Sequence, residues 1–290
     1  MTVKEFGKPN NRGLDMVITG EFVVINYPKT GSNFVRDALR KIYQNRQKSL
    51  GLYGKLNAKW NSRDGNFIRE LELPNIYVKH GIKKSPHGAY SQIPERYRGR
   101  RLVSVVRNPY DRLLSIYDFR HWVRYPAVPR EVRELEFPSF PDLNFEIFQK
   151  YLDTELRLSW LPGIEMRSEI GIQTVQFIKL FFKEPIKILC SIDEKYIQSD
   201  KFLEDMPKIT FLSTENLNSE LYGFLLNQGF PSEEVGFIIN LERVNVTENS
   251  TPKRNNLWTK NMLQDYEYKE RFLLKILKYY GFNYEKPLLE

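Results

Sequence analysis

The chain has 290 residues, of which 41% are hydrophobic and 28% charged, as in an ordinary soluble globular protein. Its 44 Lys and Arg against 36 Asp and Glu give a net charge of +8, which suits an anionic ligand. The basic residues are spread along the chain, so nucleic acid is not indicated. A single cysteine excludes an intramolecular disulfide and a cysteine-based zinc site.

Cys190 lies in an apolar run, which predicts a buried structural thiol. The N-terminal residues lack the apolar core of a signal peptide, and no stretch approaches the length of a membrane span. We therefore expect a cytoplasmic protein with no membrane partner.

Five short apolar runs predict buried β-strands, at 22–26, 76–79, 102–106, 186–189 and, more weakly, 209–212. The runs are continuous rather than alternating, as in a parallel sheet that is covered on both faces. The apolar spacing predicts helices after the first strand and from Pro109 to about Trp122. Further helices are expected at 144–157, 169–182, 194–204, 216–227 and in a final segment that ends at Gly281.

Strands that alternate with helices predict a three-layer α/β/α fold with a central, mainly parallel sheet and right-handed crossovers. No linker, repeat or low-complexity tract divides the chain, so we expect a single domain over 1–290. Residues 124–143 hold four prolines and many charges, which predicts a loop insertion over a ligand site. In such sheets, ligands bind at the carboxyl ends of the strands.

The first strand runs into Lys29-Thr30-Gly31-Ser32 and then a helix, which predicts a phosphate cradle made of backbone N–H groups. A nucleotide triphosphatase loop would place its lysine after the second glycine, whereas Lys29 precedes Gly31. The third strand is followed by Arg107, where a nucleotide triphosphatase would have a magnesium-binding Asp. No acidic residue is found at the end of a strand near the cradle. These features favour a phosphate site that needs no metal.

A second motif covers 103–117, where Arg107 ends the third strand and Ser115 follows eight residues later. Asn108 is a good N-cap and Pro109 suits the first helical turn. The planar guanidinium of Arg107 and the Ser115 hydroxyl are expected to reach one phosphate.

Together, the Pro-Lys-Thr-Gly-Ser loop and the Arg-Asn-Pro-x-Asp-Arg-x-x-Ser segment resemble those of the sulfotransferases that use 3′-phosphoadenosine 5′-phosphosulfate (PAPS). The likeness extends to the strand followed by Glu-Asn-Leu at 209–217 and to the closing helix before 279–282. It is weakest over 120–185. The resemblance implies a P-loop NTPase-like sulfotransferase fold, with PAPS as sulfuryl donor and no required metal.

The resemblance also implies roles for single residues. Lys29 would contact the oxygen that bridges phosphorus and sulfur. Arg107 and Ser115 would hold the 3′-phosphate, and a late basic segment would close over it. Phe34 would stack on adenine, although its spacing equally suits a core residue of the helix. The 5′-phosphate would be held by the Ser32 hydroxyl and by the N–H groups of Thr30, Gly31, Ser32 and Asn33; the late basic segment holds Lys253 and Arg254.

Sulfuryl transfer to a hydroxyl needs a base, and histidine is well suited. His80 ends the second predicted strand, in a Lys-His pair similar to the catalytic segment of the family, so we expect it to be the base. His87, in a Ser-Pro-His-Gly turn, is an alternative base, and the third histidine, His121, lies near the end of a long helix. A Glu, a Lys or no strong base stays an alternative.

The acceptor is expected to be a small metabolite or glycoside that offers a hydroxyl or an amine. Residues 124–143 and 159–172 are the expected walls of its pocket. A metal-dependent nucleotide kinase and a non-catalytic nucleotide or RNA-binding module are the alternative functions. The second draws on the +8 charge and the 17 tyrosines. No pattern indicates the oligomeric state.

Overall fold

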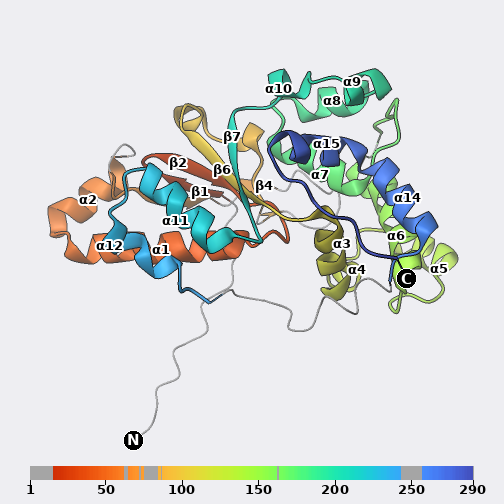
Figure 1. Ribbon diagram of the computed structural model, residues 1–290, viewed down its shortest axis with the longest axis horizontal. Coiled ribbons are helices and arrows are strands. Elements are labelled where there is room, and N and C mark those ends of the chain that lie inside the picture. The colour runs from red at the N-terminus through yellow and green to blue at the C-terminus, as the bar shows by residue number, and fades with distance from the viewer. Residues whose placement is uncertain are drawn as a thin grey trace, which may run out of the picture.

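The computed structural model describes residues 16–61, 65–71, 73–74, 84–85, 87–161, 163–242 and 257–289. A five-stranded sheet with the order β3-β1-β2-β6-β7 lies at its centre, and β4 pairs with β5 beside it (Figure 1). The strands are β1 (Met16–Thr19), β2 (Phe22–Ile25), β3 (Ile68–Leu71), β4 (Leu73–Pro74), β5 (Lys84–Ser85), β6 (Arg101–Val106) and β7 (Ile209–Ser213).

Helices surround the sheet, and several of them are short. In chain order they are α1 (Ser32–Ser49), α2 (Leu52–Trp60), α3 (Pro109–Asp118), α4 (His121–Arg124), α5 (Arg130–Glu136), α6 (Phe145–Glu155), α7 (Ile172–Phe181), α8 (Pro185–Ser191), α9 (Glu194–Gln198), α10 (Phe202–Asp205), α11 (Leu217–Asn227), α12 (Ser232–Val235), α14 (Lys260–Lys269) and α15 (Arg271–Tyr279). A π-helical turn, Leu156–Trp160, continues α6.

The sheet is mixed, with a parallel centre. β2, β6 and β7 run parallel, whereas β1 is antiparallel to both β2 and β3. β1 and β2 form a hairpin, because the Thr19 hydroxyl accepts the N–H of Phe22 and donates to its carbonyl, each at 3.0 Å. The expectation of a mainly parallel sheet is therefore correct for β2, β6 and β7, which carry the predicted motifs, whereas β1 runs against the other four strands of this sheet.

Both faces of the sheet are covered, which makes three layers. Phe22 and Val24 belong to one apolar cluster, and Val23 and Ile25 to the other, as the alternation of side chains along a strand requires. α1 and α11 cover the first face; α7 and α15 lie on the second (Figure 1). Because β2, β6 and β7 run parallel, their carboxyl ends meet at one edge of the sheet.

The structure confirms the predicted strands that begin at Phe22, at residue 102 and at Ile209, and most of the helices between them. The strand predicted at 186–189 is wrong, because these residues lie in α8, which opens with Pro185 and buries Ile188 and Leu189. Cys190, on the same helix, is exposed rather than buried. The strand predicted at 76–79 lies outside the described residues.

The helix predicted from Pro109 to about Trp122 is two helices. The break is at Arg120, whose φ of 50° is left-handed, and α4 starts directly after it. The Arg120 guanidinium donates to the Pro141 carbonyl at 3.0 Å and to the Asp142 carboxylate at 2.6 Å. The segment 124–143 is thus tied to the end of α3, and it contains the helix α5 rather than loop alone.

Candidate functional site

The cradle is the turn between β2 and α1, and its backbone is left-handed at two positions. Lys29 has a φ of 65° and Gly31 a φ of 86°. Phe34 N–H donates to the Gly31 carbonyl at 2.9 Å, which closes the first helical turn. The backbone N–H groups of residues 30–33 have no hydrogen-bond acceptor among the described residues. Successive free donors at the positive end of an 18-residue helix are chemically able to hold an anion.

Side chains of the loop hold this turn in place. The hydroxyls of Thr30 and Ser32 both donate to the Tyr27 carbonyl, at 2.9 and 3.3 Å. From the end of β7, the Thr214 hydroxyl lies 2.6 Å from the Thr30 carbonyl oxygen and 2.8 Å from that of Val106. The Ser32 hydroxyl, which the family resemblance assigns to the 5′-phosphate, is engaged within the loop here, whereas the N–H groups are free for a ligand.

Glycine is favoured at position 31 of this turn. Its φ of 86° lies in the region that favours glycine. A Cβ built on it would also stand 3.1 Å from Cδ2 of Leu217 at the start of α11, which is closer than ordinary contact. The backbone conformation thus favours the glycine predicted for the cradle, and a larger residue would also require Leu217 to shift by a few tenths of an ångström.

Lys29 points its ammonium at an aromatic ring. Nζ lies 4.3 Å from the centroid of the Phe119 ring, at the end of α3. Burial lowers the pKa of Lys29, and the positive charge of Arg107 lowers it further, while Asp118 acts in the opposite direction. Arg107 itself donates to the Lys29 carbonyl at 3.5 Å. The two predicted motifs therefore meet at this turn, and the charge of Arg107 acts on Lys29.

Arg112 is buried and connects the cradle to α7 by hydrogen bonds. It is 1% exposed; its Nε donates to the Pro28 carbonyl at 2.8 Å, and its Nη1 to Oε1 of Gln173 on α7 at 2.7 Å. The guanidinium carbon lies 4.1 Å from the centroid of the Tyr27 ring. Sequence reasoning gave Arg112 no role. The available signal was its place on the apolar side of α3, with Pro109 and Leu113, where a lone arginine needs buried partners.

The second motif forms as expected around the start of α3. The Asn108 side chain accepts the Tyr110 N–H at 3.0 Å, and Pro109 occupies the first turn. Arg107 follows β6 directly and is half-buried. Ser115 is half-buried on α3, and its hydroxyl makes no hydrogen bond within the described part of the chain.

One acidic residue closes a strand near the cradle, contrary to the sequence-based expectation. Glu215 follows β7 by two residues and accepts the Asn108 N–H at 3.1 Å. It also accepts the Ser213 hydroxyl. Among the described residues, no three of His, Cys, Asp and Glu come close enough together to hold a metal ion.

The structure brings two histidines to the cradle, and neither is the expected base. Nδ1 of His87 lies 3.1 Å from the carbonyl oxygen of Asn26, the residue that follows β2 and precedes the cradle. Burial lowers the pKa of His87 to about 4, with Arg112, Arg36 and His121 adding to the effect and the Asn26 carbonyl opposing it. His80 lies outside the described residues.

His121 opens α4, two residues after Phe119. Burial lowers its pKa to about 4, and the charges of Lys29 and Arg112 contribute. Its ring lies 5.6 Å from that of Tyr125. A neutral imidazole beside Lys29 is chemically able to accept a proton at neutral pH.

Two further expectations have different outcomes. Phe34 is 4% exposed and packs with Val35 and Leu39 in the apolar cluster between α1 and the sheet. It is therefore a core residue, and the expectation that it stacks on adenine is not supported. Lys253 and Arg254 lie outside the described residues.

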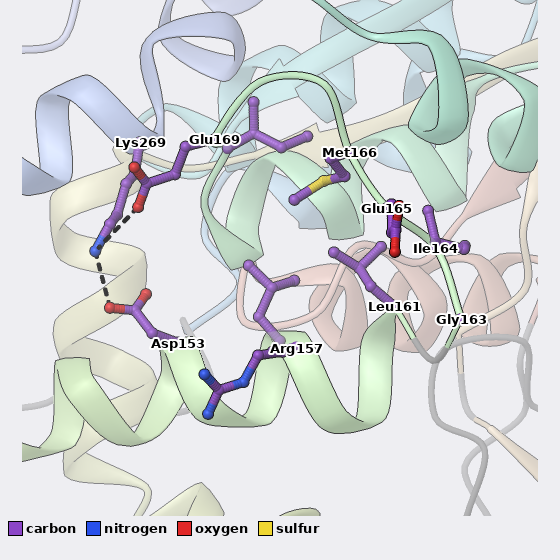
Figure 2. A pocket seen from close by; sticks show the side chains of 11 residues that line it. Asp153, Arg157, Leu161, Gly163, Ile164, Glu165, Met166, Glu169 and Lys269 are labelled. Carbon is purple, nitrogen blue, oxygen red and sulfur yellow. Dashed lines mark hydrogen bonds and ion pairs between the residues drawn. The ribbon is translucent and has the colours of Figure 1, made fainter.

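A separate pocket of about 640 Å³ lies beside α6 and the segment that follows it (Figure 2). Its apolar side is formed by Leu161, Ile164 and Met166. At the other side, Lys269 bridges Asp153 at 2.8 Å and Glu169 at 3.8 Å. Much of the predicted wall 159–172 thus lines a pocket, whereas 124–143 contributes nothing to it. No residue of this lining belongs to the cradle or to the strand ends.

Comparison with models of protein families finds no match, and no curated protein matches the chain either. Among the described helices, none is long and apolar enough to cross a membrane.

Proposed function

We propose that this protein is a PAPS-dependent sulfotransferase with a P-loop NTPase-like fold, which moves a sulfuryl group to a hydroxyl or amine of a small metabolite or glycoside. One observation carries the proposal. The free N–H groups of residues 30–33, the Lys29 ammonium and the Arg107 guanidinium come together at the carboxyl ends of two adjacent parallel strands. Such a set of donors suits a ligand with more than one anionic group.

The charge balance of the site supports an anionic ligand. The lowered pKa of Lys29 means that burial and nearby cations disfavour its charged form. Asp118 is the one opposing charge among the causes of the shift. A phosphate in the cradle would reverse this balance, so binding is expected to raise the pKa of Lys29 and to hold its ammonium in place.

In the proposed reaction, PAPS supplies the sulfuryl group: the acceptor oxygen forms a bond to sulfur as the bond from sulfur to the bridging oxygen breaks. Lys29 and the N–H groups of residues 30–33 stabilise the charge that develops on the departing phosphate. Arg107, with Ser115, positions the 3′-phosphate. The acceptor proton passes to a base of this chain.

Three histidines are candidates for that base. His80 stays the candidate from the family resemblance. The positions of His87 and His121 beside the cradle support them as alternatives, because both are neutral at pH 7 when their pKa is about 4. Acceptor screening with labelled sulfate, repeated with each of the three changed singly to Ala, identifies the base as the position at which transfer is lost while donor binding is kept.

The proposal is tested by thermal unfolding with adenosine 3′,5′-bisphosphate, the desulfated donor, beside ATP with magnesium. A ligand that binds only the native state raises the midpoint, by about 2.7 kcal/mol of stabilisation at 100 times its Kd. We expect the bisphosphate to raise the midpoint in the wild type and not in Lys29→Ala.

Lys150→Ala is the matched control, since Lys150 is an exposed lysine on α6 whose ion pair is with Glu146 at the surface. Its ligand response should equal that of the wild type. A preference for ATP with magnesium, or an undiminished response to the bisphosphate in Lys29→Ala, would contradict the proposal.

A further inference from the structure

Helix α2 presents four large apolar side chains to solvent. Leu52 is 79% exposed, Tyr53 85%, Leu56 50% and Trp60 78%. At about 3.6 residues per turn, these positions fall within one arc of roughly 100°. Scattered exposed apolar residues are ordinary, but a contiguous group on one face marks an interaction surface.

The placement of α2 leaves this face open. The helix follows α1 after Leu50 and Gly51, and it projects at the edge of the molecule, away from the helices on the other side of the sheet (Figure 1). Among the described helices and strands, its main packing partner is α1. The apolar arc is consequently available to something outside the chain.

The surroundings of α2 are strongly basic. Residues 38–61 contain six Lys or Arg and no Asp or Glu. Arg40 and Arg46 are neutralised by Glu70 and Glu234 from other segments, at 2.5 and 2.7 Å. Lys48 and Lys55 are exposed, and neither has an acidic partner within the described residues. The apolar arc is therefore bordered by positive charge that the described residues do not neutralise.

We propose that α2 attaches the protein to the surface of an anionic lipid bilayer. Leu52 and Leu56 would enter the boundary of the acyl chains, while Tyr53 and Trp60 would lie among the headgroups, where amphipathic rings are favoured. Lys48 and Lys55 would contact lipid phosphates.

Charge complementarity decides between this partner and a second copy of the chain. Two copies that met through α2 would bring two basic surfaces together, which is unfavourable, whereas anionic lipid neutralises them. A helix of nine residues spans about 14 Å and cannot cross a bilayer core of about 30 Å, so the contact is peripheral. The proposal departs from the sequence-based expectation of no membrane partner, which followed from the lack of a membrane span and did not consider a surface helix.

Tryptophan fluorescence tests the proposal directly. The chain has four tryptophans, and Trp122, Trp160 and Trp258 are at most 6% exposed. An emission shift on adding vesicles thus reports on Trp60. We expect a shift to shorter wavelength with vesicles that contain phosphatidylglycerol, little shift with pure phosphatidylcholine, and no shift in Trp60→Phe with either.

Co-sedimentation with the same vesicles measures the partition coefficient. Leu56→Ser and Lys55→Glu should each lower it by about tenfold on anionic vesicles. Leu135→Ser is the matched control, because Leu135 is 83% exposed on α5, beside Glu134 and Glu136. It should leave the partition coefficient unchanged. Circular dichroism confirms that the variants remain folded.

Three results would overturn the proposal. One is no binding to anionic vesicles. A second is binding that Lys55→Glu and Leu56→Ser leave intact. A third is a dimer in sedimentation velocity that Leu56→Ser dissociates while no vesicle binding occurs, which would assign the face to a second copy of the chain.

Discussion

The left-handed backbone of Lys29 has a cost that a pair of substitutions can measure. A non-glycine residue in this region is strained by roughly 1–2 kcal/mol, and φ is 65° here. Lys29→Ala keeps that strain, whereas Lys29→Gly removes it. The glycine also lowers the stability by about 0.4–1 kcal/mol, because it increases the conformational freedom of the unfolded chain. Both variants lack the ammonium and its contact with Phe119, so these terms cancel in the comparison.

We therefore expect Lys29→Gly to be more stable than Lys29→Ala by about 1 kcal/mol, or about 2 °C in the midpoint for a chain of this size. Urea unfolding in the absence of ligand measures the difference. Neither variant should be stabilised by adenosine 3′,5′-bisphosphate, because both lack the cation. The cradle would then hold a strained lysine for its charge, at the expense of stability.

Arg120 provides a control for the backbone effect, since its φ is 50° and it lies outside the cradle. Arg120→Gly should likewise exceed Arg120→Ala in stability, with ligand stabilisation kept in both. Equal stability of the two Lys29 variants, or greater stability of Lys29→Ala, would refute the left-handed geometry. A retained ligand response in both would refute the role of the ammonium.

Three other expectations concern the same site. Gly31→Ala should lower the free energy of unfolding by about 1–2 kcal/mol in urea titrations and weaken bisphosphate binding, because φ is 86°. Arg112→Met should lower it by about 3 kcal/mol or more, since buried carbonyl oxygens lose their donor; an effect under 1 kcal/mol would show that the contacts are dispensable. The pKa values of His87 and His121 are lowered from 6.5 to about 4, so between these pH values both bind fewer protons in the folded than in the unfolded state. The free energy of unfolding should therefore fall, by up to about 3 kcal/mol for each histidine, as the pH drops from 6.5 to 4. The pKa of Glu155, raised to about 7 by burial, acts in the opposite direction, so the test compares wild type with the double His→Gln variant, whose stability should change less steeply in this interval.

Local signals in the sequence were enough for the cradle and for the start of α3. The apolar run before Lys29, the glycine at the turn and the Asn108 cap depend on neighbours within a few residues, and the structure confirms all three. The prediction of a strand at 186–189 was wrong because a short apolar segment with β-branched residues suits a strand and a buried helix face equally. Pro185 in the first turn favours the helix.

Contacts between distant segments could not be predicted. His87 reaches Asn26 across 61 positions of the sequence, and Gln173 meets Arg112 across another 61. Whether Phe34 faces the core or a ligand depends on how α1 lies on the sheet, and apolar spacing does not determine that. The helix was expected to run past His121, because no local signal marks the left-handed Arg120 at which α3 and α4 separate.

The central claim is that one site binds two phosphates, one in the cradle and one at Arg107. Calorimetric titration of adenosine 3′,5′-bisphosphate beside adenosine 5′-monophosphate measures it most directly. The account predicts that the bisphosphate binds at least about tenfold more tightly, a difference of 1.4 kcal/mol, and that Arg107→Gln removes this advantage while leaving monophosphate binding intact. Equal affinity for the two nucleotides in the wild type, or an undiminished preference in Arg107→Gln, would contradict it.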